Sequence, residues 1–132
     1  MTERRTRQLA AVSEVLRAAH DHPTADEVHR RVRRKLPRVS LGTVYRNLEK
    51  LAARREVRVV QLTDRAARFD GMLDEHDHFL CEGCGTLTDL VRKRPARPTC
   101  SALQRAGYTV REQTVTVYGL CPRCGAKQRS VP

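Results

Sequence analysis

Four cysteines form two closely spaced pairs in the second half of the chain. Both Cys81-x-x-Cys84 and Cys121-x-x-Cys124 can place two thiolates on one tetrahedral ion, with glycines in or beside the pairs supplying tight turns. Two such pairs predict a structural zinc site with four cysteine ligands. The competing interpretations are a redox-active dithiol and disulfides, and a cytoplasmic chain disfavours disulfides.

Histidines and carboxylates provide a second candidate metal site. His76 and His78 alternate, so both point to one face if this segment is a strand, and Asp70 and Asp89 lie on either side in the sequence. Imidazole and carboxylate donors suit Fe(II), Mn(II), Zn(II) or Ni(II) and do not choose among them. The competing interpretation is a group of surface polar residues.

The charge of the chain is concentrated in its first half. The 132 residues carry a formal net charge of +11, and residues 1–62 hold 15 of the 26 basic residues but 7 of the 15 acidic ones. Such clustering favours a polyanionic partner, most often nucleic acid, over a merely solvated surface. No apolar run is long enough for a membrane helix and no secretory signal is recognised, so we expect a cytoplasmic protein without a membrane partner.

Helical periodicity dominates the first half. Apolar residues at helical spacing predict an amphipathic helix over residues 5–19. Thr24 and Glu27 form a capping box that begins a second helix, which Pro37 is expected to end. Ser40 caps a third helix, whose apolar stripe consists of Leu41, Val44, Leu48 and Leu51.

The other faces of the third helix carry side chains suited to phosphates and base edges, namely Thr43, Tyr45, Arg46, Asn47 and Lys50. Two strands, over residues 57–62 and 67–70, follow this helix and are joined by a turn. Three helices and a hairpin are typical of a winged helix-turn-helix, in which the third helix enters the major groove of double-stranded DNA. A generic small helical domain with a hairpin is the competing interpretation.

The second half is predicted to be a small α/β unit. Strands are expected near residues 87–91 and over 114–118, with a helix from Pro98 to Gly107 between them. Aromatic residues make up only 4% of the chain, and zinc binding would offset this thin apolar core because metal affinity becomes folding free energy. The predicted fold class is therefore α+β, an N-terminal winged helix-turn-helix followed by a zinc-stabilised α/β domain.

Five motifs in order, spanning nearly the whole chain, resemble the ferric uptake regulator (Fur) family. They are His22-Pro-Thr-Ala-Asp26, Thr43-Val-Tyr-Arg-Asn-Leu48, Arg68-Phe-Asp70, His76-Asp-His78-Phe-Leu-Cys81-x-x-Cys84-Gly85 and Tyr118-Gly-x-Cys121-x-x-Cys124. The resemblance implies a metal-dependent, homodimeric transcriptional repressor that binds operator DNA. It assigns residues 1–70 to a DNA-binding domain and residues 71–132 to a dimerisation and metal-binding domain.

The resemblance also implies a regulatory metal site that draws ligands from both domains. Its positions are matched by His22, Asp70, His76, His78 and Asp89. Aspartate at both acidic positions makes the chain resemble the peroxide-responsive (PerR) branch of the family. Hard oxygen donors also suit a manganese-responsive regulator. The expected regulatory ion is Mn²⁺ or Fe²⁺, although Zn²⁺ could occupy the site in a purified sample. Such ligation would lock the dimer in a DNA-binding conformer. The repressed genes would then be those of metal homeostasis or of the peroxide response.

Other classes of function fit the sequence less well. A zinc deaminase requires H-x-E and P-C-x-x-C, whereas this chain has His76-Asp77-His78 and has Pro122 after Cys121 rather than before it. Gly-rich phosphate loops and nucleophile motifs are missing, so we expect neither an enzyme nor a small-molecule substrate. The alternative function is a zinc-stabilised protein-interaction module without operator binding. Iron, manganese, zinc and peroxide acting through iron are all compatible with the ligand types.

Overall fold

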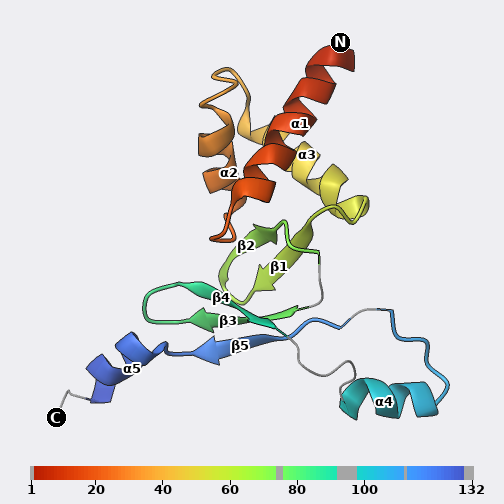
Figure 1. Ribbon diagram of the computed structural model, residues 1–132, viewed down its shortest axis with the longest axis vertical. Coiled ribbons are helices and arrows are strands. Elements are labelled where there is room, and N and C mark those ends of the chain that lie inside the picture. The colour runs from red at the N-terminus through yellow and green to blue at the C-terminus, as the bar shows by residue number, and fades with distance from the viewer. Residues whose placement is uncertain (1, 74–75, 92–97, 112, 130–132) are drawn as a thin grey trace. The chain divides into compact units, whose positions relative to one another are not determined.

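A computed structural model of the chain describes residues 2–73, 76–91, 98–111 and 113–129. These residues separate into two units, Met1–Asp74 and Glu75–Pro132, and each unit combines helices with a small sheet (Figure 1). The α+β class predicted from the sequence is confirmed. None of the described helices is both long and apolar enough to cross a membrane.

Three helices begin the first unit: α1 (Thr2–Ala18), α2 (Ala25–Val32) and α3 (Leu41–Ala53). Both predicted caps form, because Thr24 Oγ1 accepts from the N–H of Glu27 at 3.3 Å and Ser40 Oγ accepts from the N–H of Thr43 at 3.1 Å. Each cap satisfies a donor that the first helical turn leaves without a partner. Local side-chain chemistry therefore fixes where α2 and α3 begin.

The end of α2 differs from the expectation, since the helix stops at Val32 instead of continuing to Pro37. The N–H groups of Arg34 and Lys35 bond to carbonyls three residues earlier, a tighter pattern than the α-helix. The residue before a proline also disfavours the helical backbone. Residues 33–39 consequently form a loop between α2 and α3.

The core of the first unit lies where the apolar stripes of the helices meet. Its fully buried members are Val12 and Leu16 of α1, Val28 and Val32 of α2, and Val44, Leu48 and Leu51 of α3. Burial of each such side chain contributes about 1.5–3 kcal/mol. The periodicity in the sequence thus identifies the residues that hold the three helices together.

A hairpin completes the first unit. Strands β1 (Arg58–Leu62) and β2 (Arg65–Asp70) pair antiparallel, and β2 begins two residues earlier than predicted. The end of β2 also bonds to the segment before α2, because the N–H of Phe69 donates to the carbonyl of Pro23 at 2.9 Å and Thr24 forms a bridge with Arg68. This connection holds the end of β2 beside His22.

The second unit is built on a three-stranded sheet of order β4-β3-β5. Its elements are β3 (His76–Cys81), β4 (Leu87–Val91), α4 (Pro98–Arg105), β5 (Thr116–Gly119) and α5 (Pro122–Arg129). The central strand β3 pairs antiparallel with β4 and parallel with β5. Helix α5 was not predicted from the sequence, although its first residue is Pro122 and proline is favoured at the first position of a helix.

A glycine after β2 should be indispensable to the first unit. A Cβ on Gly71 would lie 2.8 Å from the carbonyl oxygen of Leu16, a backbone atom of α1. Because backbone cannot swing aside as a flexible side chain can, Gly71→Ala is expected to lower the free energy of unfolding by about 1–3 kcal/mol. Denaturant titration of the full chain measures the change.

Gly42→Ala is the matched control. A Cβ at Gly42 would meet the side chain of Arg46 at 3.5 Å, an ordinary contact, and the residue lies in the first turn of α3. Alanine there should raise the free energy of unfolding by about 0.5 kcal/mol through its better helix propensity. Similar effects at both glycines would contradict the close approach of Gly71 to α1.

Candidate metal centres and nucleic-acid interface

The first cysteine pair lies in the turn between β3 and β4. Cys81 is the last residue of β3, and its carbonyl accepts from the N–H of Gly85 at 2.8 Å. Gly85 has a φ of 77°, a left-handed conformation that glycine adopts without steric cost. The turn brings Cys84 back towards Cys81.

The second pair reaches the first through the parallel pairing of β3 with β5. Cys81 lies opposite Gly119, and the N–H of Glu82 donates to the Gly119 carbonyl at 2.7 Å. The chain then places Cys121 just before α5 and Cys124 in its first turn. A Cβ on Gly83 would lie 3.0 Å from the sulfur of Cys124, so glycine permits the close approach of the two pairs.

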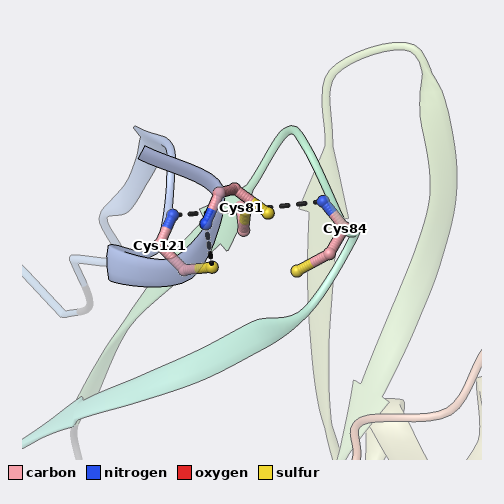
Figure 2. Close-up of side chains that lie close together, drawn as sticks. Cys81, Cys84 and Cys121 are labelled. Carbon is pink, nitrogen blue, oxygen red and sulfur yellow. Dashed lines mark hydrogen bonds between the residues drawn. The ribbon is translucent and has the colours of Figure 1, made fainter. Parts of the chain in front are cut away.

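Backbone donors surround the sulfur of Cys81. The N–H groups of Cys121 and Cys84 lie 3.3 and 3.5 Å from it, as the dashed lines of Figure 2 show. These donors stabilise the thiolate and lower the pKa of Cys81 from 9.0 to about 6. The pKa of Cys84 is also lowered, chiefly by the Thr86 hydroxyl at 3.2 Å. The lowered pKa values favour the thiolate forms of Cys81 and Cys84.

Cys124 has the opposite tendency. Its pKa is raised to about 12, chiefly by its hydrogen bond to the Cys121 thiol, because four neighbouring sulfurs cannot all be thiolates without a compensating charge. A divalent cation supplies that charge, and thiolates are the ligands that zinc prefers.

The four sulfurs fit a zinc ion. They all lie within 4.8 Å of one another, and tetrahedral zinc with bonds of about 2.3 Å needs sulfurs roughly 3.8 Å apart. Small side-chain movements would close the cluster on one ion. The donor set contains no oxygen or nitrogen, which suits a structural rather than a catalytic role.

In the first unit, His22 and Asp70 form a buried pair. His22 Nε2 lies 3.3 Å from Asp70 Oδ2, and both residues are 6% exposed. The bonds of β2 to Pro23 and Thr24 explain the proximity, since His22 precedes Pro23 and Asp70 ends β2. His22 also has a φ of 52°, in the left-handed region where a residue with a Cβ is disfavoured.

In the second unit, three donors converge at the start of β3. His76 and His78 are both buried on one face of the strand, and Asp89 is the β4 residue opposite His78. Oδ1 of Asp89 lies 3.3 Å from Nε2 of each histidine, and the imidazole centroids are 4.6 Å apart. This set of two imidazoles and a carboxylate suits a divalent transition metal.

The predicted DNA-contacting residues of α3 differ in their exposure. Tyr45, Arg46 and Lys50 are exposed and Thr43 is half-buried, whereas Asn47 is only 7% exposed. Four of the five line a hollow of about 320 Å³ between α3 and α1, here called the α3 hollow, whose lining residues are Arg5, Gln8, Thr43, Arg46, Asn47 and Lys50.

Side-chain bonds order the start of this helix surface. A guanidinium nitrogen of Arg46 donates to Thr43 Oγ1 at 3.1 Å, and the hydroxyl of Ser40 lies 2.9 Å from the same oxygen. Sequence reasoning missed the contribution of α1, because the approach of α1 to α3 is a tertiary feature. The excess of arginine in residues 1–62 was the available signal.

Comparisons with known proteins identify the family. Residues 1–118 match the Ferric uptake regulator family. The Peroxide operon regulator of Bacillus subtilis is 31% identical over 123 residues, covering 93% of this chain and 85% of the relative. The Peroxide-responsive repressor PerR of Staphylococcus saprophyticus is 32% identical over 122 residues, covering 92% of this chain and 82% of the relative.

A solved structure agrees with these sequence relatives. The Campylobacter jejuni peroxide stress regulator superposes with a TM-score of 0.76 at 27% identity, covering 92% of this chain and 91% of the other. The chain belongs to the ferric uptake regulator family, as the five motifs indicated. The named relatives are regulators and repressors.

Replacement of one of the clustered cysteines should destabilise the second unit. Cys81→Ser is expected to abolish zinc binding and to remove several kcal/mol of folding free energy, because structural zinc contributes roughly 10 kcal/mol in finger peptides. Zinc content by elemental analysis and thermal melting of the same sample measure the two effects.

Cys100→Ser is the matched control, because Cys100 lies in α4, is hydrogen-bonded to Gln113 and is not one of the clustered cysteines. It should keep one zinc per chain and melt much as the unmutated protein does. A soluble Cys81→Ser variant that lacks zinc yet melts normally would disprove the structural role.

Proposed function

We propose that this chain is a metal-dependent transcriptional repressor that binds duplex operator DNA as a homodimer. The first unit is the DNA-binding domain, with Thr43, Tyr45, Arg46, Asn47 and Lys50 of α3 serving the major groove. The ordered, basic start of α3 supports this role, because arginine and small polar side chains are suited to base edges and phosphates. The second unit is the dimerisation and metal-binding domain.

The four clustered cysteines are proposed to hold structural zinc. The convergence of their sulfurs, with the pKa of Cys81 lowered to about 6, supports that ion. Exposed apolar side chains of the second unit, including Leu90 on β4 and Val117 on β5, support a homodimer interface there.

The observation that carries the proposal is that each unit holds an incomplete ligand set. His22 and Asp70 offer two donors, and His76, His78 and Asp89 offer three. Five donors complete most of an octahedral shell, so we propose that both sets ligate one regulatory ion. Ligation by both sets would fix the two units in one conformer, and metal affinity and operator affinity would rise together by linkage.

Metal-dependent DNA affinity tests this proposal. Duplexes are selected from a random library by the Mn(II)-loaded protein, and binding is then measured with Mn(II), Fe(II) or Zn(II) on protein that retains only its structural zinc. The effective metal should tighten binding about 5- to 150-fold, the usual range of such coupling. His22→Ala should remove this gain while leaving zinc in the cysteine cluster.

Arg46→Ala is the control that tests the DNA surface itself. It should weaken binding of the selected duplex by about 1–3 kcal/mol both with and without metal, because it removes a contact to DNA but leaves every proposed metal ligand in place. Metal-indifferent binding would contradict the repressor. Failure to bind any duplex in a salt-dependent manner would favour the protein-interaction module.

The effector is proposed to be peroxide acting through Fe(II). Both sequence relatives named above are peroxide regulators, and aspartate occupies both acidic positions of the ligand set. His22 and His76 would hold the ion, and bound Fe(II) would supply redox chemistry in which peroxide gives one oxygen atom to an imidazole carbon and is itself reduced to water by the two electrons that the ring loses. Bound Mn(II) would supply this chemistry far less readily. A manganese-responsive regulator is the alternative within the family.

Mass spectrometry separates these two effectors. Protein loaded with Fe(II) or Mn(II) receives equimolar peroxide, and the peptides that contain His22 and His76 are examined for one added oxygen. We expect the addition with iron alone, accompanied by loss of operator binding. Unmodified histidines with iron, beside tight operator binding with Mn(II), would instead assign the chain to manganese response.

A further inference from the structure

A second basic hollow lies on the other side of the first turns of α1. It has a volume of about 520 Å³ and is formed by α1 together with the loop between α2 and α3. Its charged lining residues are Arg4 and Arg7 of α1 and Lys35 and Arg38 of the loop. We call it the α1–loop hollow.

The helical repeat of α1 explains why two hollows flank it. Arg4 and Arg7 are three residues apart and share one face, while Arg5 and Gln8 share the neighbouring face. Gln8 lines both hollows. The α1–loop hollow therefore adjoins the α3 hollow at Gln8, and the α3 hollow lies beside the proposed recognition helix.

The loop side of the α1–loop hollow is fixed by hydrogen bonds. The N–H of Lys35 donates to Val32, the N–H of Val39 donates to Leu36, and His29 Nε2 donates to the Val39 carbonyl, at 3.0, 3.1 and 3.0 Å. Val39 is also buried. The backbone that carries Lys35 and Arg38 is thus held in place by hydrogen bonds within the first unit.

The charges around both hollows are largely uncompensated. Among the described residues, no carboxylate lines either hollow, and none lies within ion-pair distance of Arg4, Arg7 or Arg38. Lys35 is the exception, because its Nζ lies 2.7 Å from Glu14 Oε2 on α1. Exposed cations gathered at one place repel one another, and a polyanion removes that repulsion.

We propose that one strand of the duplex runs along the start of α1 and places a backbone phosphate in the α1–loop hollow, where Arg4, Arg7 and Arg38 contact it. This inference rests on the proposed DNA binding. A phosphate contact of this kind fixes position and adds affinity for every sequence, whereas α3 reads the bases. Duplex DNA is favoured as the occupant because the hollow is lined by cations without carboxylates and adjoins the hollow beside α3 at Gln8.

The salt dependence of DNA binding tests the contact. The slope of log affinity against log salt is negative, and each lost phosphate contact should make it shallower by about 0.9. This change corresponds to about fivefold weaker binding near 0.15 M salt. Arg38→Gln should show both effects equally on the selected duplex and on random-sequence DNA. Phosphate ethylation interference should also disappear at one backbone position.

Arg17→Gln is the matched control. Arg17 is an exposed arginine of the same helix, but it lies ten residues beyond Arg7, or about 15 Å along the axis, and lines neither hollow. It removes the same charge and should leave the slope unchanged. Equal losses for Arg17→Gln and Arg38→Gln would show a general charge effect and overturn the proposed contact.

Glu14→Gln provides a gain that misfolding cannot imitate. Removal of this exposed carboxylate frees Lys35 for DNA, so binding should tighten by up to about fivefold and the slope should steepen. If the unmutated protein binds no duplex, the proposed function itself fails. If it binds, but Arg38→Gln and Glu14→Gln both leave the slope unchanged, only the α1–loop contact fails.

Discussion

The parallel pairing of β3 with β5 is the contact on which the second unit depends. It joins strands separated by β4 and α4 in the chain, and it sets Cys81 opposite Gly119, so that the two cysteine pairs meet. Closing so long a connection costs chain entropy, and a parallel ladder as short as β5 returns little of it. Four sulfurs that share one cation would supply the missing free energy, which explains why a unit with so few large apolar side chains can hold its shape.

Strand β3 also links the two candidate metal-binding clusters of the second unit. Its two-residue repeat places His76 and His78 on one face, while Cys81 at its end belongs to the sulfur cluster. A shift of one residue in its pairing with β4 would move Asp89 away from its place opposite His78 and would turn the imidazoles to the other face. The pairing of β3 with β5 therefore builds the cysteine cluster, and the pairing of β3 with β4 builds the imidazole–carboxylate set.

Sequence reasoning succeeded where the governing interaction is local. Thr24 and Ser40 are caps because their own side chains bond to N–H groups three residues later, and the buried stripe of α3 follows from helical spacing. It failed where distant segments decide. The lining of the α3 hollow by Arg5 and Gln8 depends on how α1 packs. Helix α5 begins inside the second cysteine pair, and its eight residues show no apolar periodicity that would reveal a helix. The family resemblance named His22, Asp70, His78 and Asp89 as one ligand set, but which of them lie together within each unit required the paired strands to be known.

The left-handed backbone of His22 has a consequence for the history of this family member. Glycine would fit that conformation without steric penalty, whereas a residue with a Cβ costs the fold roughly 1 kcal/mol there. We therefore expect selection to keep an imidazole here only while its side chain is in use. In a lineage that no longer needed the response, drift would replace the imidazole here early, before the buried apolar stripes had changed. The residue at position 22 would then indicate whether a related chain still uses its metal response.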